Sequence, residues 1–255
     1  MKKSFARTLI IALICLFVCN ILLSRFSGLS RSGCYFISIL LYTTILFYNI
    51  VLQYKIQKIL NEECDPYKYL TELKKFENYK RSKMHENYYA LNYSAGLINQ
   101  GKHGDAHEIL KDINPSTLIN RHKSAYYNNL MIMFLHSKQL DKAKELWNQL
   151  YIANASKKAR DTVEYNLLVF DLMYFNPSDE NRKLFIEKTE NLFSDTKRKP
   201  HMITKVAMQY SMGVAHFELG EIEQAKKCFS YTIKNGNKLH TATLARQYLE
   251  RIEAL

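Results

Sequence analysis

The chain has 255 residues, enough for one medium domain or for a small domain with an appendage. It carries 36 Lys and Arg against 24 Asp and Glu, which gives a net charge of +12. Five of the basic residues and none of the acidic ones lie in residues 1–54, so the rest has 31 against 24, or +7. This excess is too small to indicate a nucleic-acid-binding domain, and nucleic acid is not an expected partner.

The five cysteines argue against a disulfide-stabilised fold. Three lie in apolar stretches, and the other two, Cys64 and Cys228, are isolated in the sequence. The chain has no Cys-x-x-Cys pair and no regular cysteine spacing. This usage is typical of a reducing compartment.

Two apolar stretches without a charge, residues 8–24 and 34–54, occupy the N-terminal part. As helices they would measure about 26 and 30 Å, and the second length matches a hydrocarbon core. We therefore expect residues 1–54 to form a transmembrane hairpin of two helices in a lipid bilayer. A secretory signal peptide and a lipoprotein signal are the alternatives. Both fit less well, because a second stretch follows at once and Arg31 stands where a lipoprotein signal has an aliphatic residue.

The basic residues around these stretches predict an orientation, since Lys and Arg gather at cytoplasmic ends. Three of them precede the first stretch, namely Lys2, Lys3 and Arg7. Lys55 and Lys58 follow the second stretch, and the loop between the stretches holds only two basic residues. We expect both termini in the cytoplasm. Richness in Lys, Asn, Ile and Tyr suggests an AT-rich bacterial genome, and so a bacterial plasma membrane.

Helical periodicity dominates the remainder, which has few Gly and Pro and no alternating strand pattern, so we expect an all-α fold. Asp65-Pro66 has the form of a helix start, because Asp caps free N–H groups and Pro suits the first helical position. Residues 55–84 are expected to form juxtamembrane and first soluble helices. Residues 85–255 are expected to form a repeat domain.

The repeat is clearest in MGVAHFELGEIEQAKKCFSYTIKNGN, residues 212–237. Gly213 lies in the first helix, Gly220 at the turn, Ala225 early in the second helix and Phe229 four residues later. This pattern resembles the tetratricopeptide repeat (TPR), in which small residues let two helices touch and the aromatic residue fills space toward the next unit. The resemblance implies an α-solenoid of helical hairpins.

Two further stretches align on their second-helix alanines, Ala106 and Ala143, which lie 37 residues apart. The family period is about 34 residues. In the second of these stretches Lys138 replaces the turn glycine. A further hairpin is expected within residues 162–193, without the alanine or the turn glycine, and residues 241–255 are expected to form a capping helix.

The resemblance implies a scaffold or adaptor that binds a protein or peptide partner in the groove of the solenoid. The expected groove residues lie on the first helix of three hairpins: Tyr88, Leu91, Ala95, Asn99, Asn128, Ile132, His136, Tyr210, Val214 and Phe217. The alternative is a membrane-associated peptide-sensing or signalling component. A basic cluster after the transmembrane hairpin could contact anionic lipid headgroups. It comprises Lys74, Lys75, Lys80, Arg81 and Lys83.

Other motifs do not indicate catalysis or a cofactor. Residues 96–103 nearly spell a phosphate-binding loop, but His103 stands where Ser or Thr must bind Mg²⁺, and a helix is expected in place of the preceding strand. His103 and His107 have the spacing of metal ligands on one helix face, yet His103 is expected in the turn before the helix. No nucleophile has a neighbouring base, so we expect no enzyme, no metal and no cofactor.

Overall fold

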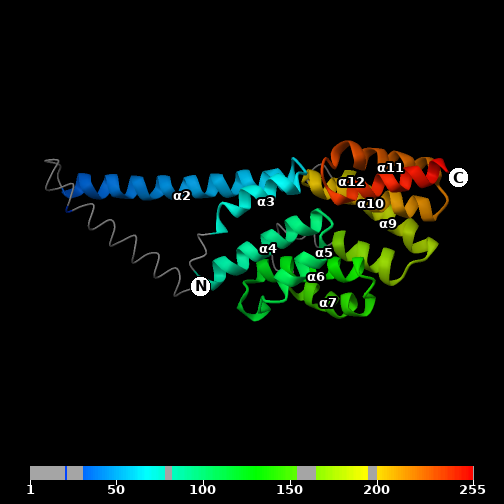
Figure 1. Cartoon of the computed structure of the whole chain (residues 1–255), viewed down its shortest axis with the longest axis horizontal. Helices are drawn as coiled ribbons and strands as arrows, with labels where there is room; N and C mark the ends of the chain where they lie inside the picture. Colours follow the sequence, from blue (N-terminus) through cyan, green and yellow to red (C-terminus); the bar gives the residue numbers. More distant parts are fainter. Residues whose placement is uncertain (1–20, 22–30, 78–81, 154–164, 195–199, 255) are drawn as a thin grey trace. The chain divides into compact units, whose positions relative to one another are not determined.

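The computed structural model describes residue 21 and residues 31–77, 82–153, 165–194 and 200–254. The chain divides into two compact units, Met1–Lys55 and Ile56–Leu255. All regular structure in the described ranges is helical, which confirms the all-α prediction (Figure 1).

Helix α2, Arg31–Asn61, contains the whole of the second apolar stretch and continues into the following residues. Along the described residues, no helix combines the length and the apolar character needed to cross a bilayer. The first apolar stretch, apart from Ile21, lies outside the described residues. The transmembrane hairpin stays a prediction.

The second unit consists of sequential helix pairs that pack against each other. After α3, Pro66–Lys74, come α4, Lys83–Asn99, and α5, His103–Leu110. The 3₁₀ turn η2, Pro115–Thr117, leads to α6, Asn120–His136, and α7, Leu140–Ala153. The third pair is helical residues 165–175, which end in the π-helix η3, Val169–Phe175, and α9, Asp179–Ser194. The last elements are α10, Met202–Glu218, α11, Ile222–Asn235, and α12, His240–Glu253.

Helix α3 starts as the sequence predicts. The Asp65 Oδ1 accepts a hydrogen bond from the Lys68 backbone N–H at 3.0 Å, and Pro66 occupies the first helical position. The side chain of Asp65 thus satisfies one of the free donors that every helix N-terminus exposes.

Three of the four hairpins share one turn geometry. The residue five positions before each second-helix alanine is left-handed: Gly101 at φ 79°, Lys138 at φ 58° and Gly220 at φ 74°. In each turn the next N–H donates to the carbonyl five residues earlier, which closes the first helix in the same way. These bonds are Lys102 to Leu97 (2.9 Å), Gln139 to Phe134 (2.8 Å) and Glu221 to His216 (2.9 Å).

The small residues of the pattern lie at close helix contacts. The second-helix alanines, Ala106, Ala143 and Ala225, are fully buried. A Cβ on Gly213 would lie 2.7 Å from the ring of Phe229, which is itself fully buried. Since real Cβ atoms do not approach so closely, a side chain at Gly213 would push α10 and α11 apart.

Polar contacts and ring contacts link the first helices of successive pairs. The Asn129 amide of α6 donates to the Ser94 hydroxyl of α4 at 3.2 Å. The Asn166 amide donates to the Asn128 carbonyl oxygen of α6, and the Tyr165 hydroxyl donates to Ser211 of α10 at 3.2 Å. At the end of the series, Tyr210 of α10 contacts Tyr248 of α12, with ring centroids 6.2 Å apart.

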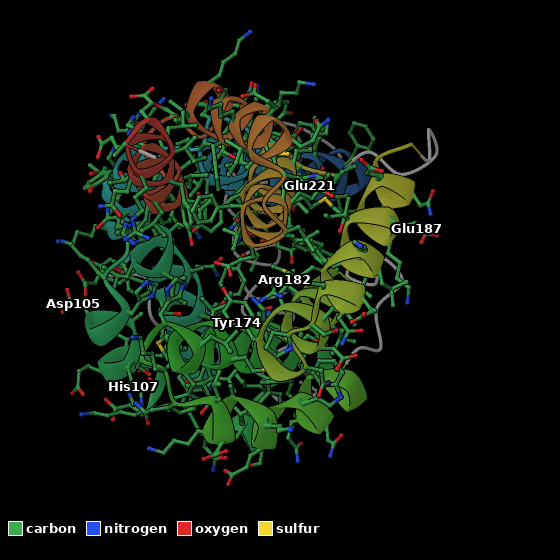
Figure 2. The ribbon with its side chains drawn as sticks, turned by 90° about the vertical axis from the view of Figure 1, so that its right-hand side faces the viewer. Asp105, His107, Tyr174, Arg182, Glu187 and Glu221 are labelled. Carbon is green, nitrogen blue, oxygen red and sulfur yellow. The ribbon has the colours of Figure 1, made fainter. Side chains whose placement is uncertain are left out.

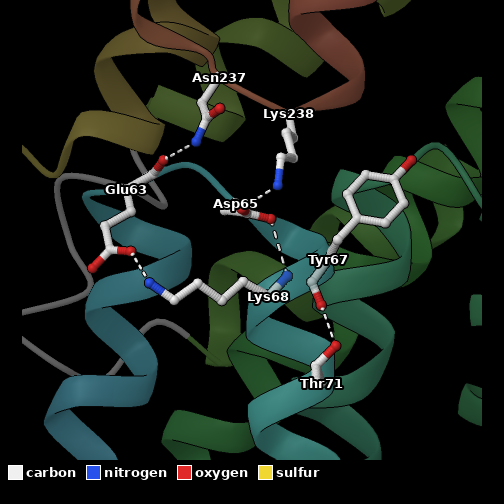
Figure 3. A network of polar contacts seen from close by, with 7 residues as sticks. All are labelled: Glu63, Asp65, Tyr67, Lys68, Thr71, Asn237 and Lys238. Atoms are coloured by element: carbon white, nitrogen blue, oxygen red, sulfur yellow. Dashed lines mark hydrogen bonds and ion pairs between the residues drawn. The ribbon is translucent and has the colours of Figure 1, made fainter.

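The two ends of the helical-pair unit also touch. The loop between α2 and α3 binds the loop between α11 and α12 through three contacts, and Figure 3 shows the two that involve side chains. The Asn237 amide donates to the Glu63 carbonyl at 2.8 Å, and the Lys238 N–H donates to the Cys64 carbonyl at 3.2 Å. The Lys238 ammonium lies 2.7 Å from the Asp65 carboxylate. We call this set of contacts the closing clamp.

Candidate functional site

The expected groove residues on α4 and α6 take part in several internal contacts. Leu91 is buried, and the ring of Tyr88 lies 5.2 Å from that of His122. The Asn99 amide donates to the Ala95 carbonyl of its own helix at 2.8 Å. On α6, Asn128 accepts from the third pair, Ile132 packs on a core cluster, and His136 stacks on His103.

The expected groove residues on α10 pack beneath the last helix. Tyr210, Val214 and Phe217 are partly buried against a core cluster that includes α11 and α12. The Phe217 and Tyr248 rings meet edge to face at 5.4 Å. These three side chains therefore stabilise the contact between the last hairpin and α12.

An open groove lies elsewhere, along the end of α3 and one side of α4 and α5. Its volume is about 750 Å³, within the range of ligand sites. None of the ten expected groove residues lines it, although six other residues of α4 do. Its lining comprises Lys74, Glu77, Lys83, Glu86, Asn87, Tyr89, Ala90, Tyr93, Glu108, Ile109, Asp112 and Ile113. We call it the tyrosine groove.

Two stacked tyrosines and an excess of carboxylates define its chemistry. The rings of Tyr89 and Tyr93, one helical turn apart on α4, lie 5.6 Å apart with an interplanar angle of 21°. Burial, Glu77 and Tyr93 together raise the pKa of Tyr89 to about 12, so its hydroxyl stays protonated. Four carboxylates and two ammonium groups line the groove, which makes it net acidic in a basic chain.

Salt bridges neutralise part of this charge. The Lys83 ammonium lies 3.3 Å from the Glu86 carboxylate, and Lys111, beside the groove, pairs with Glu108. The hydrogen bond and the charge of Lys111 lower the pKa of Glu108, which is therefore ionised at neutral pH.

The predicted basic cluster divides between described and undescribed positions. Lys80 and Arg81 lie outside the described residues. Lys75 pairs with Glu72 at 2.6 Å, whereas Lys74 and Lys83 line the tyrosine groove. Contact of this cluster with anionic lipid stays a prediction.

The histidine prediction needs one correction. His103 was expected before the helix, but it is the first residue of α5. Its ring lies 4.0 Å from that of His136 and 6.0 Å from that of His240, which brings together three helices that the sequence spacing does not connect. No group of His, Cys, Asp or Glu in the described ranges has an arrangement that could hold a metal ion.

The two cysteines of the second unit offer no reactive thiol. The free thiols of Cys64 and Cys228 are buried, and burial raises the pKa of each to about 11, so neither is an activated nucleophile.

The segment 96–103, which resembles a phosphate-binding loop in sequence, runs from α4 into α5, and a Cβ on Gly96 would lie 2.5 Å from Leu70. Close packing of α4 on α3 explains the small residue at Gly96 without a phosphate.

Comparisons with known proteins identify no relative. No family model, no curated protein and no solved structure matches the chain.

The sequence prediction missed the tyrosine groove because it selected other residues of α4, namely Tyr88, Leu91, Ala95 and Asn99. The available signal was the spacing of Tyr89 and Tyr93, which places two rings on one helix face. The carboxylates come from α4, α5 and the segments that flank them, so only the fold brings them together.

Proposed function

We propose that the protein is a membrane-tethered adaptor whose TPR-like helical hairpins hold a basic segment of a partner protein in the tyrosine groove. The observation that carries this proposal is the groove itself, about 750 Å³ in volume and lined by four carboxylates around two stacked tyrosines. Lys and Arg side chains complement such a surface, because they pair with carboxylates and are attracted to aromatic faces.

Support for the TPR-like part comes from the three shared turns. Gly101, Lys138 and Gly220 are left-handed at the same distance from a buried alanine, which is the arrangement that the sequence resemblance implies. Helical-hairpin repeats of this kind present extended surfaces that suit peptide segments.

Support for the tether comes from the sequence. Residues 8–24 and 34–54 carry no charge, and basic residues flank them on the sides that should face the cytoplasm. The adaptor would then act at the cytoplasmic face of a bacterial plasma membrane, with both termini inside.

Peptide binding by the full chain in nanodiscs of zwitterionic lipid tests the proposal. We expect a peptide of alternating Lys and Ala to bind and one of alternating Glu and Ala not to bind, in fluorescence anisotropy. The double variant Glu108→Gln/Asp112→Asn should weaken binding by about tenfold.

Glu223→Gln is the matched control, because Glu223 forms the same kind of i,i+3 pair on α11 with Lys226, away from the groove. It should leave the affinity unchanged. Equal binding of the acidic and basic peptides would contradict the proposal.

A further inference from the structure

The turn between α4 and α5 meets the start of α12, at a place distinct from both the tyrosine groove and the closing clamp. A Cβ on Gly101 would lie 2.6 Å from the His240 ring. The first hairpin and the last helix are therefore in direct contact here, although they are far apart in the sequence. We call this contact the histidine seam.

Three imidazoles from three helices meet at the seam. His103 begins α5, His136 ends α6 and His240 begins α12. The His103 and His136 rings are stacked at 4.0 Å with an interplanar angle of 14°, and the His240 ring meets His103 edge-on at 6.0 Å. Both ring nitrogens of His103 are buried without a hydrogen-bond partner.

This environment disfavours a charged His103. Its ring faces two other imidazoles, and it sits at the N-terminus of α5, where the helix dipole is positive. In the sequence, Lys102 directly precedes His103 and Lys138 follows His136 by two residues, and both are cations. The acidic residue in the first turn of α5, Asp105, lies at the outer side of the domain (Figure 2).

We propose that the histidine seam is a proton-sensitive latch: neutral imidazoles hold α12 against the first hairpin, and their protonation releases it. Two like charges on stacked rings repel each other, and a buried cation without a partner is costly. Release would free α12 at the seam while the closing clamp still holds the loop before it. The latch does not depend on the proposed peptide-binding function.

The direction of the pH response follows from the histidines. Burial, together with His136 and His240, lowers the pKa of His103 to about 4, and burial also lowers the pKa of His136 and of His240. When the seam opens, the pKa values of these histidines return toward the ordinary value of about 6.5. The open form therefore binds protons that the closed form does not. Closure is thus fully favoured above about pH 6.5 and is lost progressively as the pH falls toward 4.

Hydrogen exchange of the full chain, followed by mass spectrometry and corrected for intrinsic rates, tests the latch. Between pH 7 and pH 5 we expect exchange of α12 amides to rise by about tenfold, with a much smaller change in α11. In His103→Leu, which removes the central titrating ring but keeps an apolar side chain, the rise should be much smaller, because only His136 and His240 then bind protons on opening. In His85→Gln, which changes an exposed histidine of α4, it should persist.

A second measurement covers the case in which His103→Leu fails to fold. Carbon NMR of ¹³C-histidine in the wild-type chain should show one histidine that stays neutral down to about pH 5. The latch is overturned if α12 exchange does not change with pH, or if all histidines titrate near 6.5. It is equally overturned if Zn²⁺ alone slows α12 exchange at pH 7, because the cluster would then be a metal site.

Discussion

The last hairpin, α10 and α11, and the third hairpin, residues 165–175 and α9, have similar buried cores but different turns. Each buries a phenylalanine of its second helix completely, Phe229 in α11 and Phe185 in α9. The last hairpin turns through the left-handed Gly220 at φ 74°. The third hairpin ends its first helix in the π-helix η3 and turns through Asn176 at φ −129°. The buried second-helix aromatic is thus common to both, and the turn glycine is not.

The π-helix has a visible consequence for the side chains that it carries. A π turn inserts an extra residue into a helix and so re-aims the side chains around it. Tyr174, in η3, is 40% exposed and lies near the middle of the domain in Figure 2. In the last hairpin the regular end of α10 instead places Phe217 against Tyr248.

Truncating the two buried phenylalanines gives the largest expected effect. Phe229→Ala and Phe185→Ala should each lower the free energy of unfolding by about 4 kcal/mol, because each leaves a cavity in a closed core. Urea unfolding can be followed by the fluorescence of the single tryptophan, Trp147. Leu184→Ala, a change at an exposed neighbour on α9, is the control. A small loss for Phe185→Ala alone would show that the third hairpin is not part of the cooperative unit.

Removing the turn glycine of the last hairpin should have the next largest effect. Gly220→Ala should cost about 1–2 kcal/mol, because an L side chain disfavours the left-handed region. Nothing lies within 4 Å of a Cβ at this position, so the cost comes from the backbone alone. Gly104→Ala, also in open space but inside α5, should instead stabilise by up to about 1 kcal/mol. Thermal unfolding that moves both variants in the same direction would contradict this account.

Introducing the missing glycine into the second hairpin should give a gain. Lys138 adopts φ 58° at the equivalent position, so Lys138→Gly should relieve strain and raise the free energy of unfolding by about 0.5–1 kcal/mol. A loss in the urea titration would mean that the lysine side chain stabilises the turn by more than its backbone strain costs.

The smallest effect is expected at the turn of the third hairpin. Asn176→Gly relieves no left-handed strain and removes the hydrogen bond that the Asn176 amide donates to Asp171 at 2.7 Å. Stability should fall by about 0.5 kcal/mol, the usual value of an exposed hydrogen bond. The critical result is that the free energy of unfolding rises in Lys138→Gly and falls in Asn176→Gly. A rise in both variants would contradict the distinction between the two kinds of turn.

Local signals in the sequence were sufficient to predict the helices and the turns of three hairpins. Asp65-Pro66 marks a real helix start, and the alanines at 106, 143 and 225 mark buried contacts. The left-handed Lys138 could be located only through its spacing from Ala143, because its own residue type gives no signal. The π-helix had no signal, since its pattern of apolar residues differs little from that of an α-helix.

Contacts between distant segments of the second unit could not be predicted. The closing clamp and the histidine seam each join residues whose proximity depends on how successive pairs curve, whereas the tyrosine groove depends only on how α3, α4 and α5 pack. The curvature is the sum of small rotations between successive pairs. No single residue determines that sum, so the sequence pattern does not predict it. His103 shows the result: its sequence neighbours suggest an exposed turn, yet α6 and α12 cover its ring.

The closing clamp also constrains the order in which the molecule can be made. Asn237 donates to Glu63 across 174 positions of sequence, whereas each hairpin is a local structure. Hairpins can form one after another as a ribosome releases them, but the clamp must wait until residue 238 has emerged. Throughout that interval the loop before α3 lacks its partner, although it leaves the ribosome among the first parts of the domain. Nascent chains arrested before and after residue 238 should therefore differ in protease sensitivity near Cys64, and so report when the domain closes.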